Sequence, residues 1–115
     1  MEEALSVDEI TPEAAVTLLA GGAVLIDVRE PEEWLLGRAP QALHIPLGDL
    51  GGRVGELPRD RQLIMICRSG ARSGRAAEVL VERGLPAVNL AGGMQAWSAA
   101  ALPVVADGGA PGQVA

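Results

Sequence analysis

The feature that most restricts the fold is a short apolar run that ends at a cysteine. Leu63 to Ile66 are all apolar, and Cys67, the single cysteine of the sequence, follows them directly. A continuous rather than alternating apolar run of this length is typical of a strand buried on both faces, as in a parallel sheet. The run therefore places Cys67 at the carboxyl end of a buried strand.

A tight loop and a helix are predicted after this cysteine. Small and polar residues come first, and then the segment Ser73 to Arg83, in which Ala76, Val79 and Leu80 share one helical face. In such a loop, successive backbone N–H groups can converge on one point, to which the helix N-terminus adds its partial positive charge. An anion held at this point is stabilised.

The thiol of Cys67 is expected to lose its proton easily, because Arg68 and Arg72 add positive charge to the same place. Cysteines in such surroundings commonly titrate at roughly 3.5–7.5 instead of ~8.5. The alternative is a buried structural cysteine. Such a residue has no need of two arginines and a glycine at the end of a parallel strand, where ligands usually bind.

Four segments, taken in order, resemble the rhodanese family of sulfurtransferases. The loop that begins at Cys67 is similar to the active-site loop of that family, which starts at a persulfide-forming cysteine. The others are Leu25-Ile26-Asp27-Val28-Arg29 with Glu33-Trp34 and Gly37, then Ala42 through Ile45-Pro46, and Gly92-Gly93-Met94-Gln95-Ala96-Trp97. Together they cover about residues 8 to 100, so the resemblance extends over a whole single domain.

The resemblance implies a sulfurtransferase in which Cys67 is catalytic. Its thiolate would attack the outer sulfur of thiosulfate, expel sulfite and keep one sulfur as a persulfide for a thiol or cyanide acceptor. No cofactor and no neighbouring base are needed, because the loop can hold the thiolate ready made. The residues expected to bind the substrate are Arg68, Ser69, Gly70, Ala71, Arg72 and Ser73.

Two arginines and one aspartate leave alternatives open. Arg72 can attract the sulfonate end of the donor, as Arg68 is expected to do, or it can be structural and pair with Asp27 or Glu33. Asp27 and Arg29 can pair with partners at the surface. Alternatively, Asp27 lies beside the Cys67 loop and supports it through hydrogen bonds to backbone N–H groups or an arginine, and the resemblance favours this role.

Two other functions compete with a thiosulfate sulfurtransferase. Cysteine phosphatases also hold a thiolate in a loop of N–H groups, but five residues separate their cysteine from their arginine, and here Cys67 and Arg72 enclose only four. A sulfur-relay or protein-binding module, loaded by a partner such as a cysteine desulfurase, would use the same persulfide. Donor preference distinguishes this module from a free-standing enzyme.

The segment that joins the motif at Asp27 to the motif at Ile45-Pro46 departs from the family. Where rhodaneses usually carry Gly-His-Ile-Pro-Gly-Ala, this chain has Gly37-Arg38-Ala39-Pro40-Gln41-Ala42, and His44 replaces the common asparagine before Ile-Pro. His44 can be a general base, or it can be a structural residue whose hydrogen bonds are made within the protein. Its place at a strand end favours the structural role. One histidine and one cysteine make a poor ligand set, so no metal site is expected.

Composition narrows the class of protein. A chain of 115 residues is one domain by the usual prior. A net charge of −6 argues against nucleic acid as a partner.

The N-terminus lacks a signal-peptide pattern and no apolar segment approaches the roughly 18–20 residues that span a bilayer, so we expect a cytoplasmic protein without membrane contact. The sequence has only two Phe, Trp or Tyr residues, Trp34 and Trp97, so the core is expected to be aliphatic, with Trp34 as part of it.

The expected fold is α/β, a rhodanese-like open and mainly parallel sheet of about five strands with helices on both faces. Residues 1–102 form this domain, and residues 103–115 form a flexible C-terminal tail, because they are rich in glycine and proline and show no periodicity. A short first strand is expected over residues 5–10. Residues 47–58 carry too many glycines for a firm helix and are expected to be a frayed helix or a structured loop.

Overall fold

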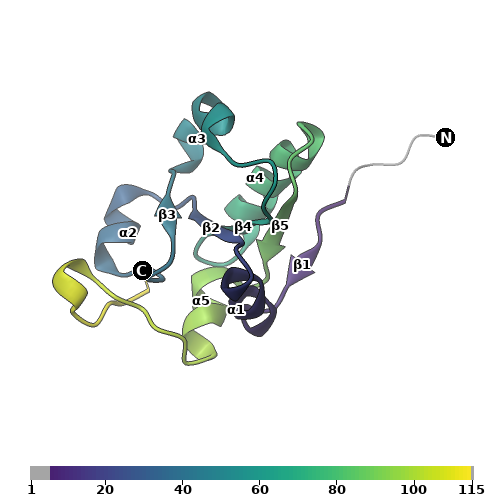
Figure 1. The fold of residues 1–115 in the computed structure, drawn as a ribbon. Helices are drawn as coiled ribbons and strands as arrows, with labels where there is room; N and C mark the ends of the chain where they lie inside the picture. Colours follow the sequence, from purple (N-terminus) through teal and green to yellow (C-terminus); the bar gives the residue numbers. More distant parts are fainter. Residues whose placement is uncertain (1–5, 115) are drawn as a thin grey trace.

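Five short parallel strands form one sheet in the computed structural model, which describes residues 6–114 (Figure 1). The strands are β1 (Glu9–Ile10), β2 (Val24–Asp27), β3 (Leu43–His44), β4 (Leu63–Ile66) and β5 (Ala87–Leu90). Their order across the sheet is β1-β5-β4-β2-β3, and all neighbours are parallel. The predicted fold is thereby confirmed, while Leu5 of the expected first strand lies outside the described residues.

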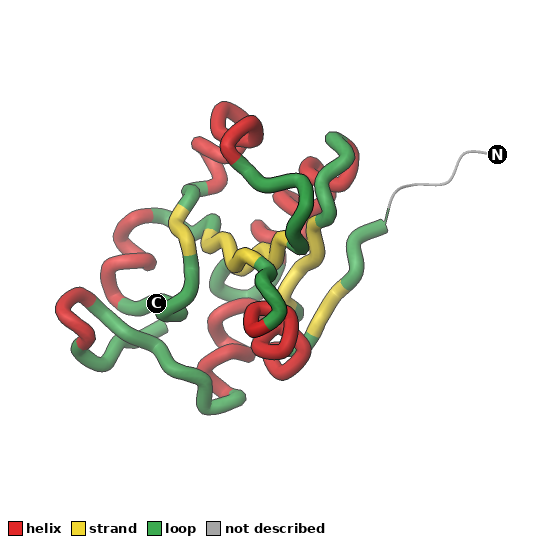
Figure 2. The backbone as a smooth tube through the Cα atoms, viewed as in Figure 1, coloured by secondary structure: helices red, strands yellow, loops and turns green. Residues whose placement is uncertain are grey.

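Helices cover both faces of the sheet, as Figure 2 shows. They are α1 (Pro12–Ala20), α2 (Pro31–Leu36), α3 (Leu47–Arg53), α4 (Ala71–Glu82) and α5 (Gly93–Ala99), with short 3-10 turns at Val54–Glu56 and Asp107–Gly109. The helix α4 has 12 residues. Within residues 6–114, no helix is long and apolar enough to cross a membrane.

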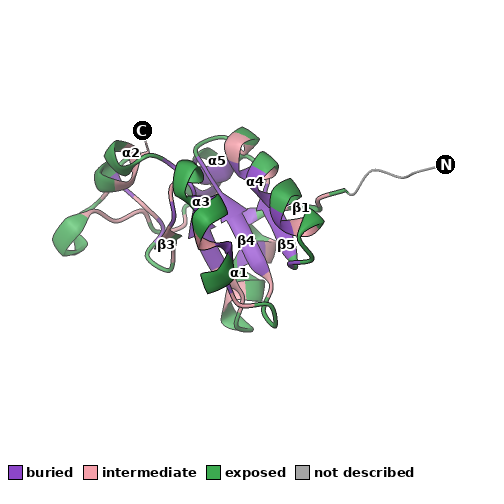
Figure 3. Cartoon of the chain, turned by 90° about the horizontal axis from the view of Figure 1, so that it is seen from above, coloured by how far each residue is buried: buried purple, intermediate pink, exposed green. Residues whose placement is uncertain are grey.

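The core has two halves because side chains alternate across the sheet. Leu63, Met65 and Cys67 face α3 and α4, whereas Ile64 and Ile66 face α1 and α5. The central strands β2, β4 and β5 are largely buried and the outer sides of the helices are exposed, as the colours of Figure 3 show. The β4 strand is therefore covered on both faces, as its continuous apolar sequence predicts. Trp97 is fully buried, but Trp34 is only half-buried, which corrects its expected place in the core.

The helix α3 corrects the expectation of a frayed helix or loop. Residues 47–53 are a regular α-helix in spite of three glycines. The reason is tertiary: Leu50 is 3% exposed and packs into the core half between the sheet and α4. Burial of one leucine contributes roughly 1.5–3 kcal/mol, which offsets much of the ~1 kcal/mol that each glycine costs a helix.

The connections of β2 and β4 run in opposite directions. After β2 the chain passes through α2 to β3, toward one edge of the sheet. After β4 it passes through α4 to β5, toward the opposite edge. Since β2 and β4 are neighbours, their carboxyl ends form a topological switch point. In open parallel sheets, ligands bind in the crevice at such a point.

The C-terminal segment lies against α2, as the yellow ribbon in Figure 1 shows. The N–H of Arg38 donates to the carbonyl of Val105 at 2.9 Å, and the N–H of Gln113 donates to the carbonyl of Leu36 at 2.9 Å. Gly37 has no room for a Cβ, because the backbone of Gln113 occupies that position. The tail thus has defined contacts, and its flexibility stays a prediction for hydrogen exchange to test.

Candidate active site

Cys67 lies where the sequence predicts, directly after β4 and 1% exposed. Gly70 forms the N-cap of α4 with φ of +105°, a left-handed conformation that favours glycine. The helix begins at Ala71, two residues before the segment in which the helical pattern starts. The loop between β4 and α4 is therefore very short, and it turns its backbone sharply around the sulfur.

Two hydrogen-bond donors approach the sulfur of Cys67. The N–H of Gly70 donates to Sγ at 3.1 Å, and the hydroxyl of Ser73 lies 3.3 Å from it. Burial raises the pKa of the Cys67 thiol, but hydrogen bonds from the Ser73 hydroxyl and from loop N–H groups outweigh it. The net pKa lies below the ordinary value, so the loop favours a thiolate.

The start of α5 holds the other side of the loop. The N–H of Met94 donates to the carbonyl of Cys67 at 2.7 Å, and the N–H of Gln95 donates to the carbonyl of Arg68 at 3.0 Å. Gly93 approaches these carbonyls so closely that a Cβ would overlap them. Because the C=O and N–H of a trans peptide point in opposite directions, these contacts turn the loop N–H groups away from α5.

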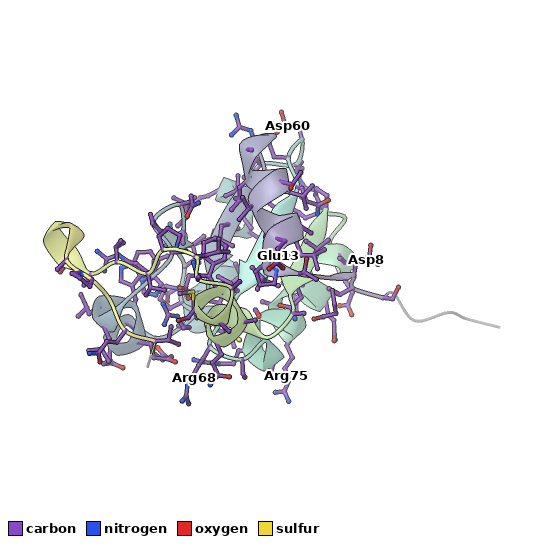
Figure 4. All side chains as sticks on the ribbon, turned by 90° about the horizontal axis from the view of Figure 1, so that it is seen from below. Asp8, Glu13, Asp60, Arg68 and Arg75 are labelled. Carbon is purple, nitrogen blue, oxygen red and sulfur yellow. The ribbon has the colours of Figure 1, made fainter. Side chains whose placement is uncertain are left out.

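The two arginines of the loop differ in their surroundings. Arg68 is exposed and points outward on the same side of the molecule as Arg75 (Figure 4). Arg72 forms a two-pronged ion pair with Glu33 of α2, with Nη1 to Oε1 at 2.7 Å and Nη2 to Oε2 at 2.8 Å. Of the alternatives for Arg72, the structural partner is therefore present, and a role in substrate binding stays a prediction.

The ion pair changes the titration of both partners. Hydrogen bonding from Arg72 lowers the pKa of Glu33 to about 2, although burial opposes the change. The same hydrogen bond raises the pKa of Arg72. Both groups are charged over the ordinary pH range, and the pair ties the first turn of α4 to α2.

Asp27 and Arg29 form a buried pair with no exposed surface. The carboxylate of Asp27 accepts from Arg29 Nη2 at 2.8 Å and from Nε at 3.0 and 3.1 Å. Arg29 also donates to the carbonyls of Gly37 at 2.7 Å and Glu33 at 3.4 Å. The expected arginine partner is thus Arg29, and the pair closes its own β2 to α2 loop. Its route to the Cys67 loop is indirect, through the helix that carries Glu33.

His44 and its neighbours form a structural stack, as the structural interpretation of His44 requires. Its ring lies 4.5 Å from that of Trp34 with an interplanar angle of 7°. On Trp34, the guanidinium of Arg38 lies 4.9 Å from the ring centroid. His44 Nε2 donates to the carbonyl of Arg29 at 2.7 Å, because a carbonyl oxygen only accepts. Two of the departures from the family pattern, Arg38 and His44, therefore meet on one tryptophan.

Sequence reasoning missed two polar residues next to the loop. Asn89 in β5 is 2% exposed, and its amide oxygen lies 2.6 Å from the Ser73 hydroxyl. Its amide nitrogen donates to the carbonyl of Gly70 at 2.9 Å and to both carboxylate oxygens of Glu9 at 3.0 Å. One signal was available for Asn89: it is the single polar residue of the buried strand Ala87–Leu90. Glu9 carries no such signal, because it lies 80 positions away and meets Asn89 only as its register partner on β1.

No metal centre is evident in the described part of the chain. Among residues 6–114, no three His, Cys, Asp or Glu side chains gather where they could share a metal ion.

Comparison with known proteins agrees with this architecture. The model of the rhodanese-like domain matches residues 11–100. A sulfurtransferase of Allochromatium vinosum is 41% identical over 106 residues, which cover 90% of this chain and 99% of that protein. The crystal structure of a rhodanese-related protein from Thermoplasma volcanium superposes with a TM-score of 0.80 at 33% identity, covering 85% of this chain and 97% of that one.

A longer protein contains a similar domain. The crystal structure of reduced Bacillus anthracis CoADR-RHD matches with a TM-score of 0.76 at 34% identity. The match covers 80% of this chain but only 16% of that one. Because the model of the rhodanese-like domain matches residues 11–100, which is most of the chain, this chain belongs to the rhodanese-like domain family.

Proposed function

We propose that this protein is a sulfurtransferase that carries a sulfane sulfur as a persulfide on Cys67. The observation that carries the proposal is the convergence of Gly70 N–H and the Ser73 hydroxyl on Sγ of the single cysteine. A site of this kind stabilises a thiolate without a neighbouring base, and it can stabilise an anionic persulfide in the same way. The relative named a sulfurtransferase, 41% identical over nearly its whole length, supports the same class of reaction.

The reaction we propose has two half-reactions. In the first, the Cys67 thiolate attacks the outer sulfur of thiosulfate, a new S–S bond forms, and the original S–S bond breaks with its electron pair leaving on sulfite. The negative charge of Sγ passes to the outer sulfur of the persulfide. In the second, an acceptor such as cyanide takes that outer sulfur, and the electron pair of the S–S bond returns to Sγ.

The charges around Cys67 suit an anionic donor. Arg68 is exposed at the start of the loop, and no ion pair of Arg68 exists among the described residues. Its guanidinium is thus free to attract thiosulfate, whereas that of Arg72 is engaged with Glu33. Since Cys67 is 1% exposed, the atoms that cover it must move aside before the outer sulfur of a donor reaches Sγ.

The decisive experiment is the intact mass of the protein after incubation with thiosulfate. We expect one added sulfur, its removal by cyanide as thiocyanate, and neither event in Cys67→Ser. The serine variant should keep the parental circular dichroism spectrum, because the two side chains are similar in size. Thiocyanate production at the parental rate by Cys67→Ser would refute the mechanism.

Donor preference decides between a thiosulfate enzyme and a sulfur relay. Loading should be compared between thiosulfate and a persulfidated small thiol, with an aryl phosphate as a control for phosphatase chemistry. Loading by thiosulfate supports the enzyme. Loading by the persulfidated thiol alone would keep the persulfide on Cys67 and replace thiosulfate by a partner donor. Hydrolysis of the aryl phosphate that disappears in Cys67→Ser would contradict both.

A further inference from the structure

One buried amide touches both groups that donate to the sulfur of Cys67. Asn89 donates through Nδ2 to the carbonyl of Gly70, whose own N–H points at Sγ, and its Oδ1 lies 2.6 Å from the hydroxyl of Ser73. Asn89 makes no contact with Sγ among the hydrogen bonds of the structure. Any effect on the thiol therefore passes through Gly70 or Ser73.

The orientation of this amide follows from its neighbours. Nδ2 faces three acceptors, the carbonyl of Gly70 and the two carboxylate oxygens of Glu9. The reversed amide would place Oδ1 against all three of these acceptors. Oδ1 is thus fixed toward Ser73, where it can only accept.

The Ser73 hydroxyl has one proton and two possible acceptors. Oδ1 of Asn89 lies at 2.6 Å and Sγ of Cys67 at 3.3 Å. While Cys67 is a thiol, its S–H can donate to Ser73 Oγ and the Ser73 hydroxyl can donate to Asn89, so all three groups are satisfied. After the thiol releases its proton to water, Asn89 and the thiolate compete for the single hydroxyl proton.

We infer that Asn89 is a positioning residue that competes with the Cys67 thiolate for the Ser73 proton, so that the hydrogen bond from Ser73 to Sγ is weaker and the thiolate is more nucleophilic. The shorter distance favours Asn89 in the competition. A thiolate with fewer donors is more basic, and thiolate nucleophilicity rises with basicity. Glu9 strengthens the effect from outside, because a carboxylate that accepts from Nδ2 polarises the amide and makes Oδ1 a better acceptor.

The arrangement also favours sulfur loading, a consequence that rests on the proposed function. In the persulfide, Sγ has passed its charge to the outer sulfur and is a weak acceptor. The Ser73 proton then returns fully to Asn89, and the competition ends. Loading therefore ends a shortage of hydrogen bonds that exists only in the thiolate, where two acceptors compete for the one proton of Ser73.

The test is the rate at which iodoacetamide alkylates Cys67 as a function of pH, which reports one residue because the sequence has one cysteine. Asn89→Leu, similar in size and without polar atoms, should lower the apparent pKa of Cys67 by roughly half to one unit, the equivalent of one ordinary hydrogen bond. The plateau rate at high pH should fall roughly 1.5- to 3-fold, because the freed Ser73 hydroxyl now donates to the thiolate.

The control is the same pair of proteins with Ser73→Ala. Without the hydroxyl, Asn89→Leu should change neither the apparent pKa nor the plateau rate, whereas a general loosening of the loop would act in both backgrounds. The charged groups around the loop, Arg72 with Glu33 and the Asp27 and Arg29 pair, are unchanged in all of these proteins. A raised or unchanged pKa in Asn89→Leu, or an equal shift in the Ser73→Ala background, would overturn the inference.

A second variant covers the case in which Asn89→Leu does not fold. Glu9 is exposed, so Glu9→Ala leaves the core intact, and it should shift the pKa and the plateau in the same direction by a smaller amount. No shift in Glu9→Ala, with Asn89→Leu unfolded, would also overturn the inference. Alkylation needs no sulfur donor, so its outcome is independent of whether thiosulfate loads the protein.

Discussion

The two loops at the carboxyl ends of β2 and β4 are neighbours in the sheet and opposites in chemistry. After β2, Asp27 and Arg29 satisfy each other's charge within one loop and have no exposed surface. After β4, Cys67 has donors aimed at a sulfur that needs them fully only as an anion, and Arg68 faces solvent without an ion pair in the described residues. In the first loop each charge already has its partner, whereas the donors of the second loop have a charged partner only when the sulfur is an anion.

This difference separates structural from chemical roles at the switch point. A buried ion pair keeps its geometry only if both partners remain, because each charge alone is costly to bury. A loop of converging N–H groups can bind a thiolate or another anion at the same point, and its fold does not depend on which anion is present. Substitutions in the first loop should therefore act on stability, and substitutions in the second on sulfur transfer.

The largest stability effect is expected from breaking the pair after β2. Arg29→Met leaves the Asp27 carboxylate buried and uncompensated, and it should lower the free energy of unfolding by about 3–5 kcal/mol. Urea unfolding measures this loss. The double variant Asp27→Leu with Arg29→Met should recover part of it, because no charge remains buried. A double variant less stable than Arg29→Met would mean that shape, and not charge, holds this loop together.

The matched change in the second loop is Arg68→Ala. Since Arg68 is exposed, the variant should unfold like the parent, within about 0.5 kcal/mol. Its loading from thiosulfate at low donor concentration should slow roughly fivefold, the equivalent of ~1 kcal/mol for an exposed charge pair, and the difference should shrink as salt rises. Stopped-flow or quenched-flow loading followed by mass spectrometry measures it. Parental loading at low salt would assign the attraction to the loop N–H groups alone.

The smallest effect is expected where the two loops are joined, at Glu33 and Arg72. The pKa of Glu33 is lowered to about 2 from 4.5, so the stabilisation is fully present above pH 4.5 and is lost as pH falls toward about 2. Because both side chains are partly exposed, we expect Glu33→Gln to cost ~1 kcal/mol or less at neutral pH. Unfolding measured across this pH range should show the parent and variant converge in acid. A constant difference would place the effect in packing and not in the charge of Glu33.

Much of the site can be predicted from local sequence. The run from Leu63 to Cys67 predicts a strand with a thiol at its end, and the pattern after Ser73 predicts the helix that follows. The alternation of strands and helices then predicts a parallel sheet. These predictions succeed because strand burial, helix periodicity and glycine turns depend on neighbours a few residues away.

Contacts between distant segments could not be predicted in the same way. The pattern of the sequence leaves Arg72 with either Asp27 or Glu33, and only the tertiary structure, in which β2 and β4 are neighbours, brings Arg72 to Glu33. Burial of Leu50 makes residues 47–53 helical against their glycine content.

What the sequence by itself determined is the order of the elements, the parallel sheet and the position of Cys67 at its edge, because these depend on local backbone preferences. What only the tertiary structure decided is the hydrogen-bond network that holds the groups next to the sulfur. Glu9, Ser73 and Asn89 come from three different elements and meet because β1 and β5 are in register beside the start of α4. A hydrogen bond acts over about 3 Å, so its partners are fixed only when the whole sheet has brought them within that distance.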